Sequence, residues 1–245
     1  MAQEDSVKPL VAITGASSGI GEAIAHRFSH AGHPLLLMAR RVERMEMSRL
    51  PDAMCEAVDV TDSDSLRAAI ARGEGRYGPV DCLVNNAGTM MLGQIDAQDR
   101  AEWERMYVVN VLALLDAMAS VLGSMRKLQS GTIINIGSTS GHTAFPDHAA
   151  YTGTKFAVSG ISENVRQDVA AEGVRVITIS PGATQTEIMD HTTSARIRED
   201  YQRWKSEIGG VLEPDDVARA VLFAYQQPPN VCVREIVIAP TRQER

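Results

Sequence analysis

Short runs of consecutive apolar residues recur along the chain, and segments with helical periodicity separate them. Seven runs predict buried strands at residues 10–14, 34–39, 55–60, 80–87, 131–138, 174–180 and 234–240. The segments between them predict helices at 20–32, 62–78, 100–128, 151–173 and 213–227. Strands that are apolar at every position are typical of a parallel sheet covered on both faces. The pattern therefore predicts one α/β domain over residues 1–245, with a doubly wound, parallel, seven-stranded sheet and helices on both faces.

Residues 183–212 fit neither pattern. This segment is polar, begins after Pro181-Gly182 and ends at Gly209-Gly210, so residues that interrupt regular structure stand at both of its ends. Two interpretations stay open: a mobile lid over the substrate, or a group of short helices.

The composition narrows the class of protein. With 245 residues, 44% of them hydrophobic, the chain can bury most of its apolar surface without disulfides or a metal. The three cysteines, Cys55, Cys82 and Cys232, are far apart and lack CxxC spacing, so we expect no metal site and interpret them as core residues in a reducing compartment. The net charge of -7 argues against general affinity for nucleic acid, which needs basic patches.

The start of the chain, MAQEDSVKPLVAITG, is acidic and lacks the apolar region of a secretory signal. We expect no run of the chain to reach the ~18–20 apolar residues that are needed to span a bilayer. We therefore predict a soluble, cytoplasmic protein with neither membrane nor nucleic-acid partners.

A glycine-rich loop, TGASSGIG, follows the first predicted strand directly and opens the first predicted helix. Gly15, Gly19 and Gly21 allow a sharp turn and a close approach of the backbone to a pyrophosphate, whose charge meets the helix N-terminus. Ser17 and Ile20 lie within the same loop. The loop predicts dinucleotide binding; the alternative is a glycine-rich turn without a ligand.

Further motifs follow this loop in a fixed order: NNAG at 85–88, Ser138, YTGTK at 151–155 and PGATQT at 181–186. Together they resemble the short-chain dehydrogenase/reductase family, and in particular its NADP-preferring members of the clavulanic-acid-dehydrogenase-like and 3-hydroxy-acid-dehydrogenase-like kinds. The resemblance implies a Rossmann-like fold, NAD(P)(H) as cofactor, and hydride exchange between a small alcohol and its carbonyl compound. It also implies a homodimer or homotetramer built on the helices at 100–128 and 151–173.

The end of the second predicted strand indicates which dinucleotide binds. NAD-preferring relatives carry an aspartate where this chain has Ala39, and Arg40 and Arg41 follow. Two guanidinium groups without a carboxylate favour the 2′-phosphate of NADP(H); the alternative is a solvated basic patch. The resemblance adds further cofactor contacts: Asp59, Val60, Asn86, Ala87, Gly88, Pro181, Gly182, Thr184 and Thr186. For Asp59 a competing role is to cap the next helix, and for Asn86 to stabilise the central strand.

Tyr151 and Lys155 stand four residues apart on a predicted helix, so their side chains share one face. A nearby cation lowers the pKa of a tyrosine, ordinarily ~10, toward the range useful for proton transfer. By resemblance, Ser138 polarises the carbonyl group, Lys155 also holds the nicotinamide ribose, and Asn110 anchors a water that Lys155 contacts. A local bond to the helix backbone is the alternative for Asn110.

Substrate specificity is expected from three groups of residues that follow strand ends: Met90, Met91 and Leu92; Ser140, His142 and Thr143; and Met189 and His191. No arginine pair among them awaits a carboxylate. A function of a different class, a non-catalytic NADP-binding regulator of the same fold, stays open as the alternative to an enzyme.

Overall fold

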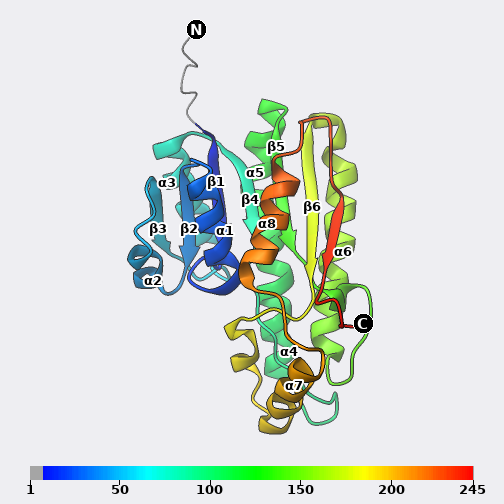
Figure 1. Ribbon diagram of the computed structural model, residues 1–245. Helices are drawn as coiled ribbons and strands as arrows, with labels where there is room; N and C mark the ends of the chain where they lie inside the picture. The colour runs from blue at the N-terminus through cyan, green and yellow to red at the C-terminus, as the bar shows by residue number, and fades with distance from the viewer. Residues whose placement is uncertain (1–7, 245) are drawn as a thin grey trace.

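Seven parallel strands form one sheet in a computed structural model that describes residues 8–244 (Figure 1). The strand order is β3-β2-β1-β4-β5-β6-β7, so the direction of winding reverses between β1 and β4. The strands are β1 (Leu10–Thr14), β2 (Leu35–Ala39), β3 (Ala53–Ala57), β4 (Val80–Asn85), β5 (Gly131–Ile136), β6 (Val174–Pro181) and β7 (Glu235–Ile238). The predicted α/β fold with a doubly wound, seven-stranded parallel sheet is confirmed.

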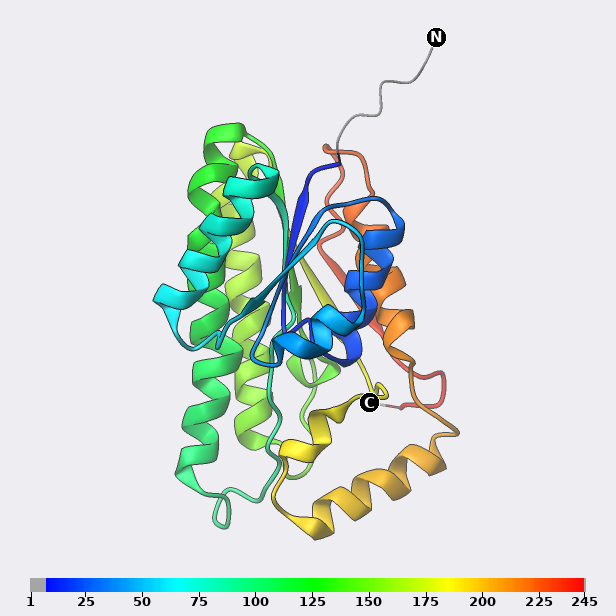
Figure 2. The same cartoon turned by 90° about the vertical axis from the view of Figure 1, so that its left-hand side faces the viewer.

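Helices cover both faces of the sheet, and Figure 2 shows the two layers on either side of it. On one face lie α3 (Ser63–Tyr77), α5 (Ala113–Leu128) and α6 (Ala149–Val169), and on the other α1 (Gly19–His30), α2 (Val42–Met47) and α8 (Pro214–Tyr225). Two more helices, α4 (Arg100–Tyr107) and α7 (Ala195–Glu207), extend beyond the carboxyl ends of the strands (Figure 1).

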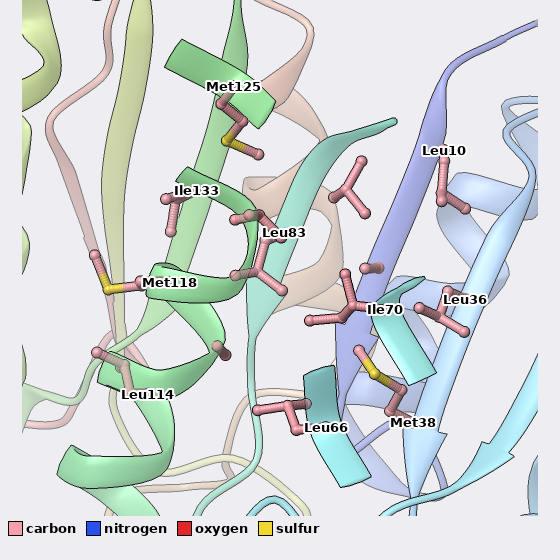
Figure 3. Packing of buried hydrophobic residues seen from close by; sticks show 14 of the residues in the cluster. Leu10, Leu36, Met38, Leu66, Ile70, Leu83, Leu114, Met118, Met125 and Ile133 are labelled. Carbon is pink, nitrogen blue, oxygen red and sulfur yellow. The ribbon is translucent and has the colours of Figure 1, made fainter. Parts of the chain in front are cut away.

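The core has two halves, one on each face of the sheet, because side chains alternate along every strand. In β1, Leu10 and Ala12 face one cluster of buried residues, while Val11 and Ile13 face the other. Figure 3 shows strand residues of the first cluster meeting side chains from α3 and α5. Each fully buried large aliphatic side chain stabilises the fold by about 1.5–3 kcal/mol, which is why the strands are apolar at nearly every position.

Several predicted boundaries are wrong in ways that reflect burial. The third strand was expected at 55–60 but runs from Ala53 to Ala57, so Asp59 lies in the loop beyond it. This strand forms the edge of the sheet and is only half-buried, which weakens its apolar signal. The helix α2 was missed. Within 183–212, the interpretation as short helices is confirmed by a 3-10 turn, η4 (Glu187–His191), and by α7.

The predicted helix at 100–128 exists, but a π-helical turn, η1 (Val108–Leu112), divides it into α4 and α5. Contrary to our expectation, the stretch Arg100–Leu128 is long and apolar enough to cross a membrane, by length and composition alone. In the described part of the chain, Leu114, Val121 and Met125 of this stretch pack against the sheet. That packing accounts for its hydropathy, because a core helix needs an apolar stripe.

Candidate active site

A cavity of about 1000 Å³ lies along the carboxyl ends of the strands. It extends from the loop after β1, across the loop after β4, to the loops after β5 and β6. The point where the strand order reverses, between β1 and β4, is where ligands bind in open α/β sheets.

The glycine loop forms one wall of this cavity. Gly15 and Gly19 have φ angles of +66° and +57°, in the left-handed region that favours glycine. A Cβ atom on Gly21 would lie 2.4 Å from the Gly15 carbonyl oxygen and 2.5 Å from Asn86 Nδ2. No side chain caps the start of α1, so its N-terminal amides remain free for an anion at the loop. Ser17 and Ile20 also line the cavity.

Asn86 fixes the glycine loop to the end of β4. Its Nδ2 donates hydrogen bonds to the carbonyl oxygens of Thr14 and Gly15, at 3.0 and 3.1 Å. The hydroxyl of Thr14 in turn accepts from the amides of Asn86 and Ala87, both at 3.1 Å. Of the two roles expected for Asn86, this geometry supplies the structural one. Asn86, Ala87 and Gly88 all border the cavity.

Basic side chains gather at the end of the cavity beside the glycine loop. Arg40 is exposed there and makes no ion pair with the described residues. Arg41 donates to Ser18 Oγ and to Glu187 Oε2, both at 2.9 Å, and Arg44 donates to Glu187 Oε1 at 2.9 Å. Glu187 thus ties the segment after β6 to α2, across the mouth of this end.

Asp59 and Val60 border the same end of the cavity. The backbone N–H of Thr61 lowers the pKa of Asp59 most, and Arg40 and Arg105 lower it further. The expected competing role, capping the next helix, falls instead to Asp62, which accepts from the amides of Asp64 and Ser65.

At the other end, Ser138, Tyr151 and Lys155 meet. Ser138 follows β5, whose last residue is Ile136 rather than 138, and its hydroxyl lies close enough to that of Tyr151 to lower the pKa of the phenol. The Lys155 ammonium donates to the Ile136 carbonyl oxygen at 2.9 Å and lies 5.9 Å from the centre of the Tyr151 ring.

The protonation of this group differs from our expectation. Burial raises the pKa of Tyr151 to about 12, against the opposing effect of Ser138, and burial lowers the pKa of Lys155 to about 8. We expected the pKa of Tyr151 to lie below its ordinary value, and in this structure it lies above that value because burial outweighs the other influences. Both side chains are buried, and a buried site favours the neutral form of each. The phenol is therefore protonated at neutral pH.

Asn110 lies buried in the π-helical turn and does not border the cavity. Its Nδ2 donates to the Thr89 carbonyl at 2.9 Å and to Thr154 Oγ1 at 3.1 Å, and its Oδ1 accepts from the Thr89 amide at 2.8 Å. The alternative of a bond to its own helix backbone is therefore wrong. The side chain joins three elements, and it makes no hydrogen bond to Lys155.

The loop after β6 closes the cavity opposite the glycine loop. Pro181, Gly182, Thr184 and Thr186 all line it, as expected. Thr186 caps η4, and its methyl group would lie 3.1 Å from a Cβ atom on Gly19. The two loops therefore face each other closely enough to enclose an extended, dinucleotide-shaped ligand.

Several lining residues were not foreseen. They come from the loop before α6 and from α7: Phe145, Pro146, Asp147, His148, Ile197, Asp200, Tyr201 and Trp204. Of the expected specificity residues, Met90, Leu92, Ser140 and His191 border the cavity, and Met91, His142, Thr143 and Met189 do not. The spacing of Ile197, Asp200, Tyr201 and Trp204 along one helix face was the signal that could have revealed α7.

Comparison with known proteins adds independent findings. The family model described as short chain dehydrogenase matches residues 9–197. An uncharacterised oxidoreductase of Staphylococcus saprophyticus is 38% identical, with 96% of each chain covered. The sulfoacetaldehyde reductase of Chromohalobacter salexigens is 36% identical, over 95% of this chain and 94% of the relative.

Solved structures similar to this chain are likewise oxidoreductases. The closed form of a serine dehydrogenase complexed with NADP+ has a TM-score of 0.88 and 29% identity, with 96% of each chain covered. An alcohol dehydrogenase from Thermococcus sibiricus, complexed with 5-hydroxy-NADP, has a TM-score of 0.86 and 26% identity, over 97% of this chain and 99% of the other.

Proposed function

Because the chain belongs to the short-chain dehydrogenase family, we propose that it is an NADP(H)-dependent oxidoreductase that interconverts a small alcohol and its carbonyl compound. The observation that carries the proposal is that Ser138, Tyr151 and Lys155 line one end of a cavity whose other end is a glycine loop.

The cavity fits the dinucleotide. The glycine loop and the free amides of α1 suit a pyrophosphate, and Arg40 and Arg41, beside uncharged Ala39, suit the phosphate that distinguishes NADP from NAD. Two of the similar solved structures were determined with NADP+ or an NADP analogue. When bound, the reduced cofactor supplies the hydride and leaves as NADP+.

In the direction of reduction, the carbonyl carbon gains the hydride, its π bond opens, and the oxygen takes the proton of the Tyr151 hydroxyl. The raised pKa of Tyr151 suits a proton donor, because the phenol is protonated at neutral pH. The Ser138 hydroxyl is placed to hydrogen-bond the same oxygen, and Lys155 stabilises the phenolate that remains until a proton from solvent replaces the one donated.

Asn110 positions residues of this site through its hydrogen bonds and does not itself line the cavity. Its side chain holds the backbone of Thr89 and the hydroxyl of Thr154, which stands one residue before Lys155. Since both side-chain atoms are engaged, we place the proposed relay water at the backbone of the π-helical turn, where the hydrogen-bond ladder is widened.

We propose that residues 1–245 act as one cofactor-binding unit in the cytoplasm, with 183–212 covering the substrate. A homo-oligomer is supported by exposed apolar side chains on the paired helices: Tyr107 and Val108, Leu112 and Leu115, and Phe156 of α6. An interface on these helices would bury them.

The experiment follows NADPH oxidation at neutral pH with a panel of aldehydes and ketones. We expect turnover in the native protein and a loss of about 10²–10⁴-fold in Tyr151→Phe, with NADPH binding retained, because only the proton donor is removed. Tyr77→Phe, at the end of α3 and away from the cavity, is the matched control and should turn over normally, because the Tyr77 hydroxyl makes no hydrogen bond to the described residues. Equal turnover in Tyr151→Phe would show that Tyr151 is not the proton donor, and NADPH binding without any turnover in the native protein would support the non-catalytic regulator.

A further inference from the structure

The cavity-facing side of α7 carries one charge, and it is negative. Ile197, Asp200, Tyr201 and Trp204 follow the spacing of a single helix face and all line the cavity. The neighbouring charged residues of α7 are exposed and do not line it: Arg196, Arg198, Glu199 and Arg203. Basic side chains of this helix are thus turned toward solvent, while the Asp200 carboxylate borders the cavity and is paired with Arg196 and Arg203 from outside.

The loop before α6 supplies a second carboxylate to the same end of the cavity. Asp147 adopts a left-handed conformation, with φ of +62°, which is uncommon for a residue other than glycine. Arg196 bridges the two walls from outside, with one nitrogen 3.4 Å from Asp147 Oδ2 and another 3.0 Å from Asp200 Oδ2. The Arg196 side chain is 58% exposed, that of Asp200 43% and that of Asp147 only 20%, so solvent screens the charge of Arg196 most and that of Asp147 least.

Aromatic rings complete both walls. The rings of Tyr201 and Trp204 lie 5.4 Å apart on α7, and those of Phe145 and His148 lie 5.5 Å apart on the loop. Burial lowers the pKa of His148, so this ring is uncharged at neutral pH. Faces of aromatic rings attract cations, and aromatic cages are a recurring site for alkylated ammonium groups.

Of the cationic side chains among the described lining residues, only Lys155 lies at this end, beside Tyr151. Of the four that border the cavity, Arg40 and Arg105 act on Asp59, Arg41 is paired with Glu187, and Lys155 is bonded to the carbonyl of Ile136. A substrate carboxylate or sulfonate would therefore face two carboxylates whose own counter-charges, Arg196 and Arg203, do not line the cavity.

We propose that the substrate carries an alkylammonium group near the carbonyl or alcohol carbon, held between the rings of α7 and the loop and neutralised by Asp200 and Asp147. The inference rests on the proposed function, because it assigns the substrate class of the same site. The hydroxyl of Tyr201 makes no hydrogen bond to the described residues and lies within electrostatic reach of Tyr151. The Tyr201 hydroxyl is thus free to hydrogen-bond the alcohol or carbonyl oxygen of the substrate.

Three alcohols of nearly the same shape test the inference: choline, its neutral carbon analogue 3,3-dimethylbutan-1-ol, and the anion 2-hydroxyethanesulfonate. Their dissociation constants are measured by calorimetry with NADP+ present, and their oxidation is followed in parallel. We expect choline to bind about 10-fold more tightly than the neutral analogue, and the anion to bind most weakly.

Two variants of α7 test whether Asp200 causes the preference for choline over its neutral analogue. Asp200→Asn should weaken choline binding about 5- to 10-fold and leave the neutral analogue unchanged. The matched control, Glu199→Gln, removes a carboxylate one residue away on the outer face and should change neither.

The outcomes separate this inference from the function on which it rests. Equal or tighter binding of the neutral analogue, preference for the anion, or unchanged choline binding in Asp200→Asn would overturn the inference alone. If neither these alcohols nor any compound of the carbonyl panel is turned over, the proposed function fails, and the inference fails with it.

Discussion

The two ends of the cavity are built in different ways. At the glycine-loop end, backbone geometry and basic side chains dominate, with Gly15 at a φ of +66° and Arg40 and Arg41 close by. At the other end, side chains from a loop and from α7 dominate, and they are aromatic or acidic. The first end suits the phosphate groups of a dinucleotide, whereas the second end offers rings and carboxylates that suit a different ligand. The difference teaches that the glycine-loop end reports the cofactor, while the other end reports the chemistry through Tyr151 and the substrate through α7.

The largest effect is expected at Lys155, which lies beside Tyr151 at the substrate end of the cavity. Lys155→Met should lower kcat/KM by about 10²–10³-fold, because no cation then stabilises the Tyr151 phenolate. Steady-state kinetics measure it, with exposed Lys127→Met as control. Activity within threefold of the native protein would contradict the role assigned to Lys155.

The same substitution should increase stability at neutral pH. The pKa of Lys155 in the folded protein is about 8, below its ordinary 10.5, so at pH 7 the folded state bears the full cost of a buried charge. We expect Lys155→Met to raise the free energy of unfolding by about 2 kcal/mol at pH 7. As pH rises from about 8 to 10.5, Lys155 loses its proton in the folded native protein but keeps it in the unfolded one, so the cost of the buried charge disappears. The stability advantage of Lys155→Met should therefore shrink over this pH range. Urea unfolding at pH 7 and pH 10 tests this, and a gain that grows with pH would contradict it.

Gly21 tests how strictly backbone geometry defines the glycine-loop end. Gly21→Ala places a Cβ atom 2.4 Å from the Gly15 carbonyl oxygen, so we expect a loss of about 1–3 kcal/mol in the free energy of unfolding and weaker NADPH binding. Gly75→Ala on α3 is the matched control, because its Cβ atom meets nothing within 4 Å and should be neutral or stabilising by up to about 1 kcal/mol. Equal effects of the two would show that the close approach is unimportant.

Substitution of Arg40 tests whether the positive charge at the glycine-loop end selects NADPH over NADH. Arg40→Ala should raise the dissociation constant for NADPH about 10-fold and change that for NADH less than about twofold, since only NADPH carries the extra phosphate. Fluorescence titration measures both, with Arg67→Ala on the exposed face of α3 as control. A similar loss for both cofactors would assign Arg40 to general attraction instead.

The smallest effect is expected at Glu187, whose partners Arg44 and Arg41 lower its pKa. Glu187→Gln removes a negative charge near the phosphate site, so NADPH should bind about two- to threefold more tightly at low salt. This difference should vanish at high salt because the ion pairs are exposed. Weaker binding would indicate that closure of the cavity matters more than charge.

The sequence predicted the sheet because its central strands are buried on both faces. It misplaced β3 because that edge strand is half-buried, and it missed α2 because six residues following two arginines carry too little periodicity. The glycine loop and the group around Tyr151 were predictable because each is a local motif placed at a strand end or along one helix.

Features that depend on distant residues were not predictable. The pKa of Tyr151 depends on how deeply the fold buries its side chain. The four-residue spacing between Tyr151 and Lys155 gives no information about that burial. Asn110 is satisfied by Thr89 and Thr154, 21 and 44 residues away, and Glu187 is paired with an arginine 146 residues away. The acidic lining of the substrate end arises only when α7 packs over the cavity.

The segment after β6 has a consequence for the order of events in catalysis. It meets Arg41 and Arg44 through Glu187 and continues directly into α7, so one stretch of chain covers both ends of the cavity. We expect the cofactor to enter first and leave last, because the stretch that encloses it also forms the substrate wall. Product inhibition by NADP+ that is competitive with NADPH would be the kinetic signature of such an ordered sequence, and exchange of cofactor would then limit the rate whenever chemistry is fast.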